Sequence, residues 1–233
     1  MKTLVVTGGS KGIGLATAEL FAAQGYRVVN LSRSAIPLPD AIQLSVDMAE
    51  PGWTDRHSAA LLAAVGDGGQ LVLVHNAALL SKDRVEDLDA TRLARVLQIN
   101  VVAPQQLNRI LLARMGSGSA IVYVGSTLAE KAVAGSCAYV VSKHALLGLM
   151  RATCQDLAGR GIHTACVCPG FTDTEMLRAH VGQNPAILGS LARGVTFGRL
   201  VEPVEVARTI LFCAENPVIN GAVIHANLGQ VEH

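Results

Sequence analysis

The sequence predicts an α/β protein built on a doubly wound parallel sheet of about seven strands, with helices on both faces in a three-layer αβα sandwich. Short β-branched runs alternate with longer helical patterns along the whole chain. These runs are continuously apolar rather than alternating, which is typical of strands covered on both faces. Half of the 233 residues are apolar and only 16% are charged, so the chain can bury a sizeable core.

The expected elements follow in chain order. β-Branched, apolar runs predict strands at residues 3–8, 27–32, 41–46, 70–76, 119–125, 162–170 and 221–227. Helical patterns between them predict helices near residues 12–25, 54–66, 87–115, 137–159 and 203–215. No linker or repeat divides the chain, so we expect one domain over residues 1–233. The long stretch at 171–201, between the last two strands, is expected to form a substrate lid.

Charge and composition argue against several classes of partner. Nineteen basic and eighteen acidic residues give a net charge of +1 without runs of like charge, so we expect neither nucleic acid nor a membrane surface as a partner. No apolar stretch approaches the length needed to span a bilayer. The opening "MKTLVVTGG" leads directly into a strand and lacks the zones of a secretion signal. Five cysteines without CxxC spacing favour reduced thiols, and we expect a cytoplasmic protein.

Cys166 and Cys168 would share one face of a strand. Such a pair could bind a metal, but no second pair of ligands accompanies it. Packing in the core is therefore the favoured interpretation, and no metal is expected.

The first predicted strand runs into a glycine-rich turn, "TGGSKGIG", at residues 7–14, which opens the first helix. Glycines allow a tight turn and close backbone approach, and amide groups at a helix start favour an anionic pyrophosphate. The turn is neither GxGxxG nor a P-loop, and a turn kept small only for helix packing is the alternative. The expected dinucleotide contacts are Gly8, Ser10, Lys11, Gly12, Ile13 and Gly14.

The second predicted strand ends in "NLSRS", where an NAD-preferring protein would carry a carboxylate for the ribose hydroxyls. Ser32 and Arg33 stand there instead, and Lys11 adds a cation from the glycine-rich turn. A hydroxyl with two cations suits a 2′-phosphate, so the sequence predicts NADP(H). The alternative for Arg33 is a solvated loop residue.

The stretch "YVVSK" places Tyr139 and Lys143 four residues apart on a predicted helix. Both side chains would therefore project from one face and could meet. On spacing alone, the pair is either an ordinary amphipathic edge or a site of acid chemistry.

Six motifs occur in a specific order: "TGGSKGIG", "HNAA", Asn100 in "LQIN", Ser126 in "VYVGS", "YVVSK" and "CPGFTDTEM". With this set the chain resembles the short-chain dehydrogenase/reductase family over nearly its whole length. The segment "GRLVEPVEVA" at 198–207 is similar to that of single-domain 3-oxoacyl-ACP reductase-like members. The resemblance implies a dinucleotide-binding Rossmann sheet.

The resemblance also implies roles for four residues. Tyr139 would donate and accept the proton, and Lys143 would lower its pKa and bind the nicotinamide ribose. Ser126 would hold the substrate oxygen, and Asn100 would position a water in a proton relay. A free phenol has a pKa of about 10. A neighbouring cation favours phenolate and so brings this pKa toward the working pH, as efficient proton transfer requires.

Further cofactor contacts follow from the same resemblance. Asp47 would meet the adenine amino group, although an exposed carboxylate at a strand end is its alternative. The other expected contacts are Met48, Asn76, Ala77, Pro169, Gly170, Thr172 and Thr174, together with Tyr139 and Lys143.

The expected function is an NADP(H)-dependent oxidoreductase that transfers a hydride between the cofactor and a small carbonyl or secondary alcohol. One alternative is a 3-oxoacyl-thioester reductase with an acyl carrier protein as partner, bound through Arg178, Arg193 and Arg199. Another is a catalytically silent NADP(H)-binding sensor. Apolar outer faces on the helices at 87–115 and 137–159 predict a homodimer or homotetramer.

Overall fold

The computed structural model describes residues 2–182 and 184–231, and its strands form one parallel sheet. Among these residues the strand order is β3-β2-β1-β4-β5-β6-β7. The strands are β1 (Lys2–Thr7), β2 (Arg27–Ser32), β3 (Ile42–Ser45), β4 (Gln70–His75), β5 (Ala120–Val124), β6 (His163–Pro169) and β7 (Ala222–Ala226). Because β1 pairs with both β2 and β4, the order reverses beside β1. The predicted doubly wound sheet is confirmed.

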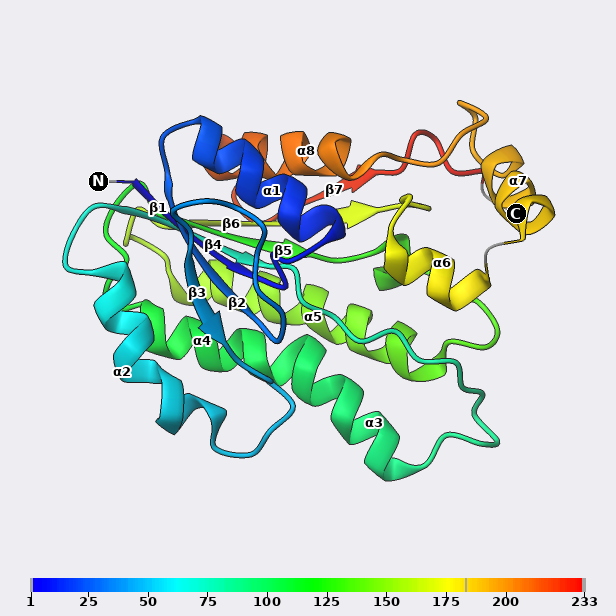
Figure 1. The fold of residues 1–233 in the computed structure, drawn as a ribbon, viewed down its shortest axis with the longest axis horizontal. Coiled ribbons are helices and arrows are strands. Elements are labelled where there is room, and N and C mark those ends of the chain that lie inside the picture. The colour runs from blue at the N-terminus through cyan, green and yellow to red at the C-terminus, as the bar shows by residue number, and fades with distance from the viewer. Residues whose placement is uncertain (1, 183, 232–233) are drawn as a thin grey trace.

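Helices cover both faces of this sheet, as Figure 1 shows. One face carries α1 (Gly12–Ala23) and α8 (Pro203–Glu215), which pack against each other. The other carries α2 (Trp53–Val65), α3 (Ala90–Leu97), α4 (Ala103–Leu111) and α5 (Cys137–Asp156). Two short helices, α6 (Glu175–Val181) and α7 (Pro185–Arg193), lie at one end of the molecule. Short 3-10 turns occupy η2 (Thr127–Ala129) and η3 (Pro217–Ile219).

The helix expected over 87–115 is shorter and interrupted. It begins after Asp89, whose side chain accepts a hydrogen bond from the Arg92 backbone N–H at 2.8 Å. A π-helical turn, η1 (Gln98–Val102), then separates α3 from α4. Asn100 lies in this turn, and its buried side chain ties the turn to the backbone of Leu79. An apolar pattern does not reveal this turn, nor the contact that Asn100 makes with a residue 21 positions away.

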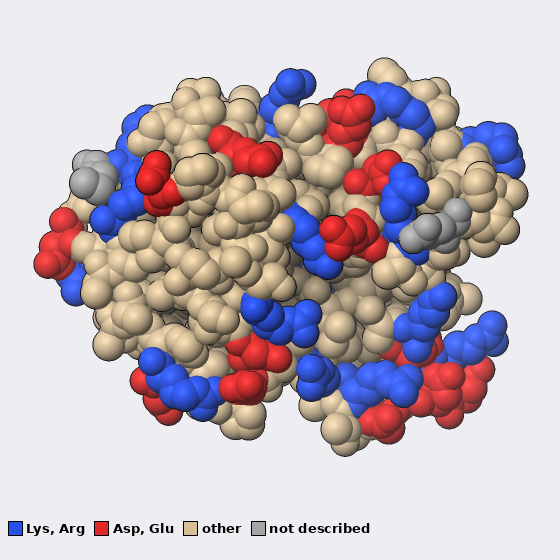
Figure 2. All heavy atoms as spheres, viewed as in Figure 1, with Lys and Arg blue, Asp and Glu red and all other residues tan. Residues whose placement is uncertain are grey.

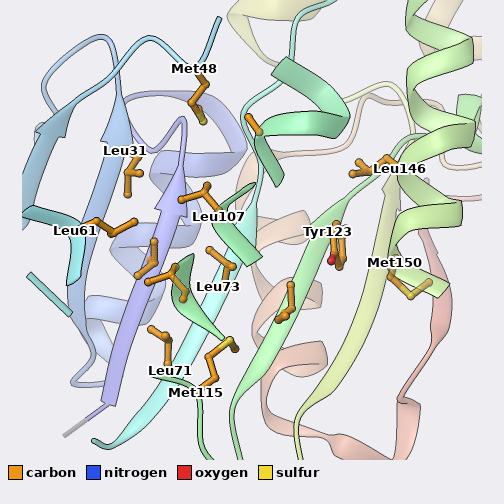
Figure 3. Packing of buried hydrophobic residues seen from close by; sticks show 14 of the residues in the cluster. Leu31, Met48, Leu61, Leu71, Leu73, Leu107, Met115, Tyr123, Leu146 and Met150 are labelled. Carbon is orange, nitrogen blue, oxygen red and sulfur yellow. The ribbon is translucent and has the colours of Figure 1, made fainter. Parts of the chain in front are cut away.

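The core lies in two layers, one on each side of the sheet. Successive residues of β1 alternate between them, with Leu4 facing α1 and α8 and Val5 facing α2, α4 and α5. Figure 3 shows the second layer, in which Leu73, Leu107 and Leu146 are almost wholly buried. The sheet is thus covered on both faces, as the continuous hydrophobicity of its strands predicts.

Charges on the surface are of mixed sign. Figure 2 shows basic and acidic side chains interspersed over one face of the molecule. That face lacks a continuous basic track of the kind that follows a phosphate backbone. Within residues 2–182 and 184–231, the longest helices are too short or too polar to cross a membrane.

Candidate active site

A cleft of about 610 Å³ collects residues from the turns that follow β1, β2, β4, β5 and β6. Open parallel sheets bind ligands outside the carboxyl ends of their strands, so this is the expected position. The cleft is lined by Gly8, Ser10, Lys11, Gly12, Ile13, Ser32, Arg33, Asp47, Met48, Asn76, Ala77, Ser126, Tyr139, Lys143, Pro169, Gly170, Thr172 and Thr174. All were predicted from the sequence. Two other predicted residues, Gly14 and Asn100, are outside its lining.

The glycine-rich turn contains glycines at positions where a side chain would be strained or would clash. Gly8 and Gly12 have φ values of +69° and +56°, a region that favours glycine. A Cβ on Gly14 would lie 2.3 Å from the Gly8 carbonyl oxygen. Gly14 therefore permits α1 to pack against the turn, and its contact with a cofactor stays a prediction. Asn76 braces the same turn by donating to the carbonyls of Thr7 and Gly8 at 2.9 and 3.2 Å.

Tyr139 and Lys143 lie on α5 and are nearly buried, with 9% and 2% of their surfaces exposed. The Tyr139 phenol is hydrogen-bonded to the side chain of Ser126. Lys143 Nζ donates to the Val124 carbonyl at 2.7 Å and lies 5.4 Å from the centre of the Tyr139 ring. Ser126 also caps η2, since its Oγ accepts from the Leu128 backbone N–H at 3.1 Å. The structure thus brings three of the four predicted catalytic side chains together.

The protonation of this cluster differs from the expectation. Burial raises the pKa of Tyr139 to about 12, which outweighs the hydrogen bond from Ser126 that lowers it. Burial also lowers the pKa of Lys143 to about 8. The pKa of Tyr139 therefore shifts in the direction opposite to the expected lowering, because burial of the phenol outweighs the hydrogen bond that favours phenolate. At neutral pH the site holds a neutral phenol, which can act as an acid.

Asp83 positions the start of α5. This role was not predicted from the sequence. Its carboxylate accepts from the Ala138 backbone N–H at 2.8 Å, and a second oxygen is bonded to the Ser81 hydroxyl. Asp83 is 3% exposed, so it acts as a buried cap for the helix that carries Tyr139.

Asn100 is buried behind the cleft. Its Oδ1 accepts from the Leu79 N–H at 2.7 Å, and its Nδ2 donates to the Leu79 carbonyl at 3.1 Å and to Ser142 Oγ at 2.8 Å. Both amide hydrogens are therefore engaged by the protein. This side chain links the loop after β4 to α5, so it acts as a positioning residue in the structure.

The two cations predicted to meet a phosphate differ in their surroundings. Arg33 is exposed and has no ion-pair partner within the described part of the chain. Lys11, the second predicted cation, pairs with Glu175 at 2.7 Å between Nζ and Oε2. Asp47 is half-buried and accepts from the Ala49 N–H at 2.9 Å, a local turn bond that leaves its predicted contact with adenine untested.

The other end of the cleft is mainly apolar and was not predicted residue by residue. Its lining includes Leu80, Leu128, Val133, Phe171, Met176, Leu177, Val181 and Leu191. Polar groups there include Arg95, His180 and Gln230. Burial, together with the charge of Lys82, lowers the pKa of His180. A substrate with a substantial apolar part suits this lining.

Two short helices carry much of this wall. Thr174 caps α6 by accepting from the Leu177 N–H, and Asn184 caps α7 ahead of Pro185. A cap residue followed by a helix former is a recognisable start signal, and it was available in the sequence.

Cys166 and Cys168 lie in the core beneath the site, in agreement with the favoured interpretation that they pack in the core. Both are fully buried, and their sulfur atoms are 3.8 Å apart. They fill the space next to Gly125, where a Cβ would lie 2.7 Å from the Cys166 sulfur.

Comparisons with known proteins agree with this geometry. A profile of the family described as "Enoyl-(Acyl carrier protein) reductase" matches residues 8–230. The chain is 32% identical over 233 residues to carbonyl reductase family member 4 of Danio rerio, with 94% of each chain covered. The chain belongs to the short-chain dehydrogenase/reductase family.

Other members of the short-chain dehydrogenase/reductase family are similarly related. A 3-oxoacyl-[acyl-carrier-protein] reductase of Vibrio cholerae is 29% identical over 240 residues, which cover 98% of this chain and 97% of the relative. A short-chain dehydrogenase from Burkholderia cenocepacia, solved in complex with NADP, superposes with a TM-score of 0.87 at 28% identity. That match covers 98% of this chain and 97% of the other. The predicted family is confirmed, and this chain is an oxidoreductase of it.

Proposed function

We propose that this short-chain dehydrogenase/reductase transfers a hydride between NADP(H) and a carbonyl or secondary alcohol, with Tyr139 as general acid and base. The observation that carries the proposal is the buried phenol of Tyr139, bonded to Ser126 and followed one helical turn later by Lys143 in the ligand cleft. A neutral phenol and a hydroxyl side by side suit an oxygen that gains negative charge.

In the proposed reaction, a nicotinamide cofactor held in this cleft would supply the hydride. As the carbonyl carbon gains the hydride, its oxygen gains the Tyr139 proton while Ser126 donates a hydrogen bond to it. The phenolate then takes a proton from solvent. Alcohol oxidation runs these steps in reverse, and Lys143 favours the phenolate form.

Two features of the cleft support a dinucleotide with a 2′-phosphate as its ligand. The tight turn at Gly8 and Gly12 allows the backbone to approach a pyrophosphate closely. Arg33 is exposed beside the cleft, and its planar guanidinium suits a phosphate. The Burkholderia cenocepacia relative, solved with NADP, adds support.

We expect NADPH to be preferred over NADH by at least about tenfold in KM, because Arg33 and Lys11 can both pair with the 2′-phosphate, at about 1 kcal/mol each. Arg33→Ala should reduce that ratio, chiefly by raising KM for NADPH. Steady-state kinetics with both cofactors test this, and Arg208→Ala, which changes an exposed arginine outside the cleft lining, is the control. Equal use of both cofactors by the unaltered protein would show the expectation to be wrong.

A direct test of the proposed function follows NADPH consumption across ketones, aldehydes, quinones and acyl thioesters. We expect turnover with at least one class that combines a carbonyl with an apolar body. NADPH binding without turnover of any class would favour the silent sensor instead.

The alternative, a 3-oxoacyl-thioester reductase, is supported by the Vibrio cholerae relative and by the description of the matching family. A basic docking patch for a carrier protein has weaker support. Arg178 is held by Asp173 through two bonds of 2.7 and 2.8 Å, and Arg199 is likewise held by Glu205. Only a marked preference for acyl thioesters over simple ketones in kcat/KM would favour this alternative.

We also propose a homodimer or homotetramer, in which the outer face of α5 is covered. That face is apolar and accessible, with Val141 43% exposed and Leu149 partly exposed. Light scattering at micromolar concentration should return a mass of at least two chains. A stable monomer would refute the prediction.

Residues 171–201, with residue 183 outside the described part, are proposed as the substrate lid, because α6 and α7 line the apolar end of the cleft. We further propose one domain over residues 1–233 and a cytoplasmic location.

A further inference from the structure

An ion pair joins the two walls of the cofactor cleft. Lys11 comes from the glycine-rich turn and Glu175 from the first residue of α6, 164 positions later. Their charged atoms are 2.7 Å apart, and both residues line the cleft. The pair therefore connects the expected phosphate site to the proposed lid.

The backbone around this pair holds the two walls close together. A Cβ on Gly12 would lie 3.3 Å from Thr174 Cγ2, so the turn and the start of α6 are nearly in contact. Thr174 in turn caps α6, since its Oγ1 accepts from the Leu177 N–H at 3.2 Å. Glu175 is thus fixed next to the turn by its own helix, whereas Lys11 extends from a turn on a flexible stem.

The pair is open to solvent and can exchange partners. The Lys11 and Glu175 side chains are 63% and 70% exposed. Exposed ion pairs are worth little, so a dianionic phosphate competes readily for the same ammonium. Within the described part of the cleft lining, Glu175 and Asp47 are the carboxylates, and Asp47 accepts a bond in its own turn.

We propose that Glu175 sets the affinity for NADP(H), because it competes with the 2′-phosphate of the cofactor for the Lys11 ammonium. The inference rests on the proposed use of NADP(H). Glu175 is then a specificity-determining residue that weakens NADP(H) binding without affecting NAD(H), and Arg33 provides the uncontested cation.

The test is a double-mutant cycle on cofactor binding, measured by fluorescence or calorimetry. Glu175→Gln should lower Kd for NADPH by about two- to fivefold and leave Kd for NADH unchanged. Adenosine 2′,5′-bisphosphate should respond like NADPH, and 5′-AMP should not respond. Glu86→Gln, which removes an exposed acid paired with Arg84 outside the cleft lining, should leave every Kd unchanged.

The second arm of the cycle uses Lys11→Met. In that background, Glu175→Gln should no longer tighten NADPH, since the contested ammonium is gone. If Glu175 acted only by repelling the phosphate, its replacement would tighten NADPH equally in both backgrounds, which would overturn the proposal. An unchanged Kd for NADPH in Glu175→Gln, or equal tightening of NADPH and NADH, would overturn it as well.

Failure of the cofactor proposal has a different signature. If the unaltered protein bound adenosine 2′,5′-bisphosphate no better than 5′-AMP, the expected NADP(H) preference itself would be wrong. If the protein preferred NADP(H) but the Glu175 variants did not respond as stated, only the proposed competition between Glu175 and the 2′-phosphate would be wrong.

Discussion

Tyr139→Phe is expected to lower kcat by at least about a hundredfold, because it removes the transferable proton while keeping the ring. Burial raises the pKa of Tyr139 to about 12, so the native side chain is a neutral phenol over the whole working range and can donate its proton. Kd for NADPH should stay close to that of the unaltered protein. Steady-state kinetics and cofactor titration measure the two effects separately.

The chain offers a matched control for this substitution. Tyr26 is buried, and its hydroxyl has no hydrogen-bond partner within the described residues. Tyr26→Phe also removes a phenol hydroxyl, but at a position outside the cleft lining, so it should leave kcat unchanged. If Tyr139→Phe kept near-normal turnover with a good substrate, the pair with Lys143 would be an amphipathic edge and the proposed mechanism would fall.

Lys143→Met should damage both turnover and cofactor binding. The native ammonium is buried and bonded to the Val124 carbonyl at 2.7 Å, and its proposed roles are to favour phenolate and to bind the nicotinamide ribose. We expect Kd for NADPH to rise by about tenfold, the effect of one hydrogen bond to a charged group, and kcat to fall by at least about tenfold. Methionine is unbranched and fills the same space, and a circular dichroism melt checks that the variant folds.

The same residue predicts a pH dependence. Burial lowers the pKa of Lys143 to about 8, so the side chain is charged at pH 7 and loses its proton as the pH rises through that value. Loss of the charge weakens cofactor binding, so kcat/KM for carbonyl reduction should decrease above pH 8. In Lys143→Met this decrease should be absent. The same inflection in the variant would assign it to another group.

The fold was predictable because local and long-range signals agree in this chain. Strands such as 70–75 are apolar on both faces, which is a property of the sequence itself. The helix of residues 203–215 was predicted with its observed bounds from its helical pattern. In the structure Pro203 begins this helix, and Glu202 and Glu205 form a capping box. The helices α6 and α7 were missed, because each spans nine residues or fewer.

The proximity of the proposed catalytic pair was predictable for a similar reason. Tyr139 and Lys143 lie on one helix, so their spacing alone sets their relative position. Contacts between distant segments could not be predicted. Asp83 caps α5 from 55 positions away, and Glu175 reaches Lys11 from 164. The direction of the Tyr139 pKa was missed because it depends on burial, which spacing does not show.

The central claim is direct hydride transfer between NADP(H) and a carbonyl carbon. The most direct measurement uses NADPH that carries deuterium at both positions of nicotinamide C4, with a carbonyl compound turned over in ordinary water. We predict that mass spectrometry finds one deuterium in each product molecule, bonded to the former carbonyl carbon. Product without deuterium at that carbon, formed while NADPH is consumed, would contradict the account.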